Sequence, residues 1–260
     1  MAAFRVRLLA DPPARGARNM AVDHALMESA GRTGIVTLRL YRWEPGCLSF
    51  GRNQEARGRY DGERAAALGY DVVRRPTGGR SVLHHRELTY SVTAPADWGS
   101  LREAYLRINR ALAVGLRRLG APAAVHEGDG GPAPRPTVRA CFRDPLPGEV
   151  TAGGRKLVGS AQWRDAGALL QHGSILLRNE QDVVERLRVD GPPPADVPAA
   201  GLAELLGREP DATELERALA AGFAEVLEAE LVPAAPAPEE EERACALQPR
   251  YEDRAWTWRL

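Results

Sequence analysis

Residues Arg74–Val92 read "RRPTGGRSVLHHRELTYSV". A glycine pair lies among three arginines, which indicates a backbone that approaches a ligand attracted to positive charge. A hairpin turn would explain the same glycines. The alternating "ELTYSV" that follows is typical of a β-strand. Only the rest of the chain can decide between a ligand-binding turn and an ordinary hairpin.

The segments around this stretch mix strands and helices without a regular alternation. We therefore predict an α/β (α+β) domain, with a central mixed β-sheet flanked by helices, rather than a doubly wound fold. Neither a GxGxxG turn nor a GxxxxGK[ST] loop is present. Predicted strands include residues 4–10, 36–43 and 70–75, with 80–85 and 87–94 paired to each other. Predicted helices are 19–31, 63–69, 101–120 and 213–231.

Helix boundaries follow from cap residues and apolar spacing. Residues 101–120 carry an apolar stripe at intervals of three and four that ends at Gly120, so we expect this helix to pack on the core. Asn19 is the predicted cap of the first helix, and Thr213 with Glu216 the predicted capping box of the last.

The chain is predicted to hold one domain, residues 1–232. Residues 233–243, which contain "PAAPAPEEEE", are predicted to be an acidic Pro/Ala linker with a solvated charge run. Residues 244–260 then bring Trp256 and Trp258 back as a docking tail. Two further loops, Glu127–Thr137 and Gly191–Gly201, are predicted from their glycine and proline content.

Composition excludes several classes of protein. Lys+Arg and Asp+Glu are both 35, so a neutral net charge argues against a nucleic-acid-coating protein. No apolar run is long enough to span a membrane, and we expect a cytoplasmic protein that binds neither nucleic acid nor membrane. Three cysteines and five histidines show no metal-ligand spacing. On a strand His84 and His85 would point to opposite faces, so no metal site is predicted.

Cys141 is one candidate for chemistry. It lies in "VRACFRDPLPGEV", before a turn punctuated by prolines. Most free cysteines are small buried apolar residues, and a nucleophile needs an electropositive and partly exposed setting. The local sequence leaves both interpretations open.

Lys156 is the only lysine in the chain, and all other residues counted as Lys+Arg are arginines. A compact ammonium with a tunable pKa does what arginine cannot, although a surface turn would also accept a lysine. The glycines around it, Gly159 among them, would let a ligand approach the backbone. His172 interrupts an apolar strand, so its ring nitrogens need hydrogen-bond partners, either in the core or on a ligand.

Four segments together resemble one family. They are "ARNMAVDHALM", "LSFGRNQ", "RRPTGGRSVLHHRELTYSV" and "RKLVGSAQWRDAGALLQHGSILL", and they span Ala17 to Leu177. In this order they are similar to the lipoate-protein ligase A and octanoyltransferase branch of the biotin/lipoate protein-ligase superfamily. The resemblance implies a central mixed sheet with helices and a small second sheet.

The resemblance also implies site residues. It makes Cys141 and Lys156 catalytic, with Cys141 in an "ACFxxPxxxE" context 15 positions before Lys156 (141 to 156). The acyl pocket would be formed by the arginine–glycine stretch and the later strands. Expected substrate-binding residues are Arg74, Arg75, Gly78, Gly79, Arg80, Val82, His84, Gly159, Ser160 and His172, with Leu83 as a further candidate for the wall. His85 stands where the family usually has aspartate, so no role is carried over to it.

The implied reaction is octanoyl transfer. The donor would be octanoyl-acyl carrier protein or octanoyl-H protein of the glycine-cleavage system, and the acceptor a lysine of a lipoyl domain. Cys141 would form an octanoyl-enzyme, Lys156 would stabilise the oxyanion, and neutral Lys156 is a possible base. No cofactor is expected, and we expect a monomer.

Two alternative activities remain open. An ATP-dependent lipoate-protein ligase would use ATP and magnesium to activate a free acid. A non-catalytic module would bind acyl groups or lipoyl domains without turnover, and retention of both Cys141 and Lys156 argues against it. The Gly78-Gly79-Arg80 turn favours the transferase, because ligases usually carry a third glycine there.

Overall fold

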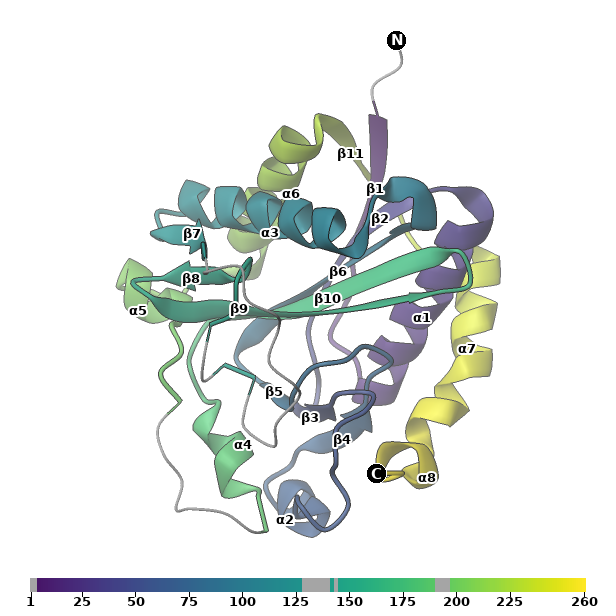
Figure 1. The fold of residues 1–260 in the computed structure, drawn as a ribbon, viewed down its shortest axis with the longest axis vertical. Coiled ribbons are helices and arrows are strands. Elements are labelled where there is room, and N and C mark those ends of the chain that lie inside the picture. Colours follow the sequence, from purple (N-terminus) through teal and green to yellow (C-terminus); the bar gives the residue numbers. More distant parts are fainter. Residues whose placement is uncertain (1–3, 128–140, 143–144, 190–196) are drawn as a thin grey trace.

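An eight-stranded mixed sheet forms the centre of the computed structural model, which describes residues 4–127, 141–142, 145–189 and 197–260 (Figure 1). Its strand order is β11-β1-β2-β6-β10-β9-β8-β7. The first three run parallel to one another, and all other neighbours are antiparallel. The prediction of a mixed sheet is confirmed. The strands are β1 Phe4–Ala10, β2 Val36–Tyr41, β6 Glu87–Pro95, β7 Ala123–Val125, β8 Val150–Ala152, β9 Arg155–Asp165, β10 Ala168–Leu176 and β11 Ala229–Pro233.

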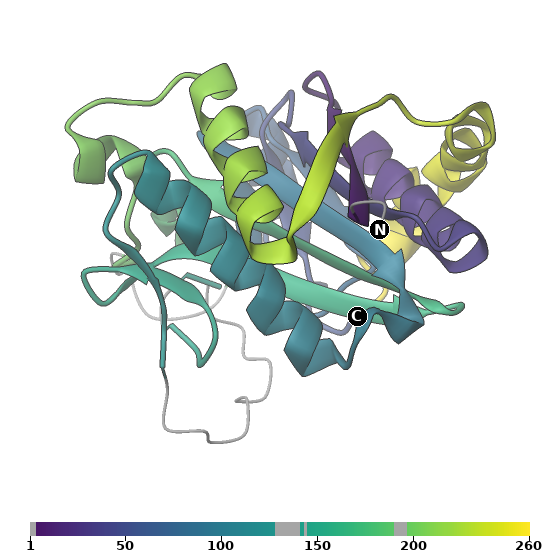
Figure 2. The same ribbon diagram turned by 90° about the horizontal axis from the view of Figure 1, so that it is seen from above.

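Helices cover both faces of this sheet. On one face α3 (Leu101–Arg118) and α6 (Ala212–Leu227) lie side by side, as Figure 2 shows, and on the other α1 (Gly16–Thr33) packs against α7 (Pro238–Glu252). The predicted stripe of α3 is confirmed, since Ile108, Leu112 and Leu116 are fully buried. Gly222 allows α6 to approach α3, because a Cβ there would lie 2.4 Å from the Gly115 nitrogen. The shorter helices are α2 Gly62–Ala67, α4 Asp182–Arg186, α5 Leu202–Leu206, α8 Arg254–Thr257 and the 3₁₀ turn η1 Ala96–Trp98.

A second, three-stranded sheet lies below the large one in Figure 1, in the order β4-β3-β5. Its strands are β3 Cys47–Phe50, β4 Asp71–Arg74 and β5 Val82–His84. The predicted pairing of 80–85 with 87–94 is wrong, because β5 pairs with β3 while β6 joins the large sheet. Arg86, with φ of 52°, turns the chain between them. β6 is buried from Glu87 to Ala94, so it belongs at the centre of the larger sheet.

The predicted linker 233–243 is also wrong, because α7 begins inside it at Pro238. Proline suits the first helical position, and three glutamates in the first turn favour the positive end of the helix. Glu240 accepts hydrogen bonds from the Ala237 nitrogen at 2.7 Å and from both terminal nitrogens of Arg7 at 3.0 and 2.7 Å. The acidic run is therefore a docked helix start. Residues 244–260 do pack back on the domain, as predicted, with Tyr251 buried.

Two helix caps differ from prediction. Asn19 is inside α1, where its side chain donates to the carbonyls of Ala14 and Arg42 at 3.1 and 3.0 Å. Asp211, rather than Thr213, caps α6 by accepting from the Glu214 nitrogen. In the described ranges no helix is long and apolar enough to cross a membrane. Most of the predicted loops at 127–137 and 191–201 lies outside the described residues.

The last predicted helix ends early. It stops at Leu227 because Glu228 takes a left-handed conformation with φ of 50°. The next five residues form β11 instead, in parallel register with β1.

Candidate active site

A narrow pocket lies between the two sheets. The space among its lining atoms, open solvent included, is about 360 Å³, and the centre of a water-sized sphere can reach only about 20 Å³ of it. Apolar side chains and glycine backbone form much of its wall, with a few polar groups among them. It is lined by Met20, Tyr41, Trp43, Arg75, Val82, His84, Thr89, Cys141, Gly159, Ser160, Ala161, His172, Gly173 and Ser174.

Cys141 lies at this pocket and is partly exposed. Its backbone nitrogen donates to the Ser81 carbonyl at 3.1 Å. The thiol lies against Gly159 of β9, where an added Cβ would be 3.4 Å from Sγ and 2.8 Å from the Phe142 ring. The absence of a side chain at Gly159 thus leaves room for the Cys141 thiol and the Phe142 ring. Cys47, in contrast, is fully buried in β3, where burial raises the pKa of its thiol.

Lys156 projects from β9 toward Cys141 and is buried. Its Nζ lies 3.5 Å from Cys141 Sγ and donates to the Cys141 carbonyl at 2.9 Å and to Glu149 Oε1 at 2.6 Å. Burial works to lower the pKa of Lys156, but Cys141 and Glu149 outweigh it, and the pKa is raised. The ammonium form therefore persists, and the expectation that neutral Lys156 acts as a base is not supported.

Glu149 is a site residue for which no role was predicted. It is buried beside Lys156, and its second oxygen accepts from the Leu146 nitrogen at 2.8 Å. The signal was present, because Glu149 is the last letter of the "ACFxxPxxxE" pattern. A buried ammonium needs a carboxylate partner, and this glutamate supplies it.

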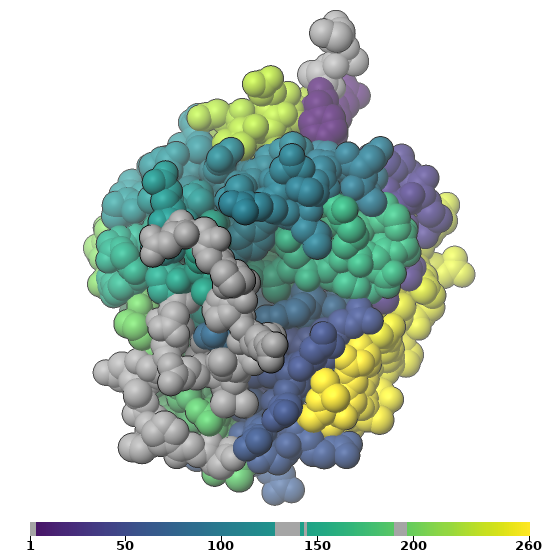
Figure 3. Space-filling view, viewed as in Figure 1, coloured from purple at the N-terminus to yellow at the C-terminus, as the bar shows by residue number. Residues whose placement is uncertain are grey.

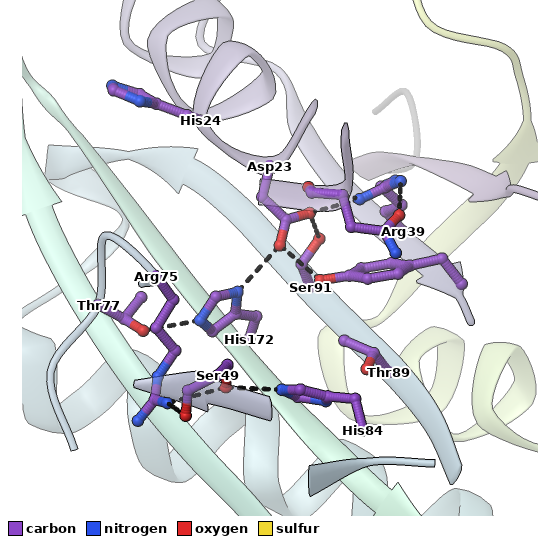
Figure 4. Close-up of polar contacts among 12 residues, drawn as sticks. Asp23, His24, Arg39, Ser49, Arg75, Thr77, His84, Thr89, Ser91 and His172 are labelled. Atoms are coloured by element: carbon purple, nitrogen blue, oxygen red, sulfur yellow. Dashed lines mark hydrogen bonds and ion pairs between the residues drawn. The ribbon is translucent and has the colours of Figure 1, made fainter. Parts of the chain in front are cut away.

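A buried polar chain runs from α1 to the glycine turn through His172 (Figure 4). His172 Nδ1 lies 2.9 Å from Asp23 Oδ2, and its Nε2 lies 2.7 Å from Thr77 Oγ1. Burial favours neutral Asp23, but His172 and then Arg39 outweigh burial, so the pKa of Asp23 is lowered. Ionised Asp23 makes Nδ1 of His172 the donor to its carboxylate. The sequence did not single out Asp23, although it lies within the quoted "MAVDHALM" segment.

The two adjacent histidines separate as predicted. His84 stacks on Trp43 at the pocket, with ring centroids 4.0 Å apart, and its Nε2 lies 2.8 Å from Ser49 Oγ. Burial lowers the pKa of His84, although nearby Glu87 acts in the opposite direction. His85 lies outside the pocket lining, with Nδ1 2.5 Å from Glu180. Among the residues that the structure describes, no three metal-ligating side chains converge.

The two adjacent arginines of the opening stretch, Arg74 and Arg75, differ in role. Arg75 lines the pocket and donates to the carbonyls of Gly78 and Arg80 at 2.7 and 2.6 Å; burial lowers its pKa to about 10. Arg74 is not a lining residue. It donates to the carbonyls of Gly51 and Gln54, each at 2.7 Å, and the structure gives it a scaffold role in place of the expected substrate contact.

The glycine turn supports the wall from behind rather than lining it. Gly79 has φ of 87°, and a Cβ on Gly51 would lie 2.0 Å from its carbonyl oxygen. Gly78, Gly79 and Arg80 are absent from the lining. Leu83 of β5 packs into the core, whereas Val82 and Ser160 do line the pocket. The glycine turn itself is therefore neither a hairpin between paired strands nor a direct ligand cradle, although Arg75, Val82 and His84 on either side of it do line the pocket.

Comparison with known proteins agrees with this geometry. Residues 15–224 match the model of the lipoyl protein ligase A/B catalytic domain. The chain is 42% identical to an octanoyltransferase LipM of Kyrpidia tusciae, over 97% of this chain and 98% of that protein. It is 40% identical to an octanoyltransferase LipM of Symbiobacterium thermophilum, over 97% and 98%.

Solved structures share the fold. A lipoate-protein ligase A bound with ATP superposes with a TM-score of 0.79 at 24% identity, over 99% of each chain. A bi-partite lipoate protein ligase from Thermoplasma acidophilum gives 0.79 at 23%, over 99% of this chain and 97% of that one. These identities bear on the fold alone. Fold, family model and full-length relatives agree, and the chain belongs to the lipoyl protein ligase A/B catalytic domain family.

Proposed function

We propose that this chain transfers an octanoyl group from a carrier thioester to a lipoyl-domain lysine through an octanoyl-Cys141 intermediate. The observation that carries the mechanism is the Cys141 thiol at the pocket, with the Lys156 ammonium 3.5 Å from its sulfur. The octanoyltransferase activity itself was predicted from sequence and is confirmed by the full-length relatives.

In the first step the Cys141 sulfur attacks the thioester carbonyl. A carbon–sulfur bond to Cys141 forms, the bond to the carrier sulfur breaks, and the cysteine proton leaves with the carrier thiol. Lys156 stays positive throughout, because Glu149 balances it, and it stabilises both the thiolate and the oxyanion. The octanoyl chain lies against the apolar wall that includes Val82 and Met20.

In the second step the neutral amine of the acceptor lysine attacks octanoyl-Cys141. The amide forms, the carbon–sulfur bond breaks, and the amine proton returns to the cysteine sulfur. Protons therefore balance over the cycle without a separate base. An amide is more stable than a thioester, so the transfer needs no ATP.

The partners follow from this chemistry. The donor is an octanoylated carrier, either acyl carrier protein or the H protein, and the acceptor is a lipoyl domain. A monomeric state and a cytoplasmic location stay predictions. ATP and magnesium would enter only if the chain were a ligase.

Intact mass spectrometry tests the proposal. The purified protein is mixed with octanoyl-acyl carrier protein without ATP, beside Cys141→Ala and, as a matched control, Cys245→Ser at an exposed thiol. We expect one octanoyl group on wild type and on Cys245→Ser, none on Cys141→Ala, and transfer of that group to an added lipoyl domain. No adduct on wild type would overturn the cysteine mechanism, and AMP release from ATP with free lipoate would then identify a ligase.

A further inference from the structure

Three guanidinium groups gather around two tryptophans on one face of the molecule. We call this set, Arg52, Arg250, Arg259, Trp163 and Trp256, the arginine rim. The Arg52 guanidinium lies 5.2 Å from the Trp163 ring centroid, and those of Arg250 and Arg259 each lie 4.2 Å from the Trp256 centroid. In Figure 3 the blue, green and yellow segments that carry the rim lie side by side.

The rim holds three positive charges close together. Within the described ranges, none of its three arginines forms an ion pair, and the nearby Glu252 accepts from Gln248 instead. The Arg259 Nε atom is buried and has no hydrogen-bond partner among the described residues. Burial, then Arg52 and Arg250, lowers the pKa of Arg259. Like charges held together are unfavourable, and an anionic ligand would relieve both problems.

The rim borders the pocket. The Arg52 backbone nitrogen donates to the Thr77 carbonyl at 2.8 Å, and the Thr77 side chain contacts His172 of the pocket wall. Ala161 lines the pocket, and Trp163 follows two residues later on the same face of β9, about 7 Å further along the strand. An anion held by the rim therefore lies beside the route to Cys141.

We propose that the arginine rim docks the acidic face of the donor carrier protein and guides its thioester arm into the pocket, an inference that rests on the proposed function. Arginine and tryptophan dominate the energetics of protein interfaces. Complementary charge at the rim of a site chiefly raises the rate of association. The rim carries charge and lies outside the pocket lining, so it is not the site of the apolar eight-carbon chain itself.

The test is steady-state kinetics of Arg52→Gln/Arg250→Gln with three donors: octanoyl-acyl carrier protein, octanoyl-phosphopantetheine and octanoyl-pantetheine. Arg118→Gln/Arg208→Gln is the control, because it removes the same charge from arginines near α3 and α6. We expect KM for the carrier protein to rise about tenfold, with a weaker salt dependence, and no change for either small donor or for the lipoyl domain. Arg250→Glu alone, at an exposed site, should give the same pattern, because it also changes the charge of the rim by two units.

Other outcomes would overturn the inference. An equal rise with octanoyl-phosphopantetheine would place the arm's phosphate, not the carrier's surface, on the rim. A rise confined to the lipoyl domain would make the rim an acceptor site. If the wild-type protein turns over no thioester, the proposed function fails. Fluorescence anisotropy of carrier-protein binding still tests whether the rim docks the carrier: an equal Kd for wild type and the Arg52→Gln/Arg250→Gln variant would refute the docking.

Discussion

The buried pair of Lys156 and Glu149 makes the sharpest energetic prediction. Their side chains are 2% and 4% exposed, and Nζ lies 2.6 Å from Oε1. At an effective dielectric of about 20, unit charges at 2.6 Å attract by about 6 kcal/mol, most of which offsets the cost of burying them. Removing one partner leaves the other charged and buried, so Lys156→Met and Glu149→Gln should each cost about 3–5 kcal/mol of unfolding free energy.

A double-mutant cycle isolates the pair. The double variant should lose clearly less than the sum of the single losses, with a coupling of about 2–3 kcal/mol. Urea denaturation at neutral pH measures all four proteins. The exposed pair of Arg118 and Glu225, also 2.6 Å apart but more than half exposed on each side, is the matched control, with a coupling below about 1 kcal/mol.

A coupling free energy between Lys156 and Glu149 no larger than that of the exposed control would contradict this prediction. Lys156 would then not depend on Glu149 for its charge. The assignment of a permanent ammonium beside Cys141 would fail with it.

Three further predictions concern stability and the thiol. Burial lowers the pKa of His24 to about 4 in the folded protein, against 6.5 in the unfolded chain, so between these pH values the unfolded chain binds one proton more. The free energy of unfolding should therefore fall by about 3 kcal/mol as the pH drops from 6.5 to 4. In urea denaturation, His24→Asn should lack this part of the pH dependence. An unchanged pH slope in the variant would contradict it. Gly159→Ala should slow octanoyl-Cys141 formation at least about tenfold, because its Cβ would displace Phe142 and the thiol, whereas Gly78→Ala, with open space around its Cβ, should be nearly silent in the same mass assay. Equal rates for the two would show that Gly159 does not position the thiol. Glu240→Ala should lower the free energy of unfolding by about 1–3 kcal/mol and speed amide hydrogen exchange in α7, because it removes the contact with Arg7. Glu241→Ala, at an exposed position, should lower it by less than about 1 kcal/mol. Equal losses in the two variants would mean that the Arg7 contact does not stabilise the helix.

Local signals were sufficient for much of the fold. The stripe of α3 and the alternation of β6 are properties of neighbouring residues, so their spacing predicts them. Partner choice is different. β5 pairs with β3, 33 residues or more earlier, because the fully buried β6 pairs within the large sheet instead. A short sequence pattern contains no information about which of these distant strands will pair. The start of α7 was missed because Glu240 is stabilised by Arg7 at the other end of the chain.

The site shows the same division. Cys141 and Lys156 could be singled out because their residue types are rare in this composition. Arg74 and Arg75 look alike in sequence, but alternation along β4 and beyond sends one to carbonyls of the 51–54 loop and the other to the pocket. Asp23 and Glu149 act through partners that lie far away or across a turn, so their roles became visible only when those contacts were in place.

The pairing of β11 with β1 has a consequence for how the chain is made. Every residue that lines the pocket, from Met20 to Ser174, leaves the ribosome before residues 229–233 exist. Until then β1 is an open edge, and open edges recruit other strands and promote aggregation. β11 is short, carries Glu230 and ends in Pro233, which are features that discourage further pairing. All pocket residues of the nascent chain are therefore synthesised while the edge strand β1 is still unpaired. Synthesis of β11 then covers this edge and prevents its pairing with other chains.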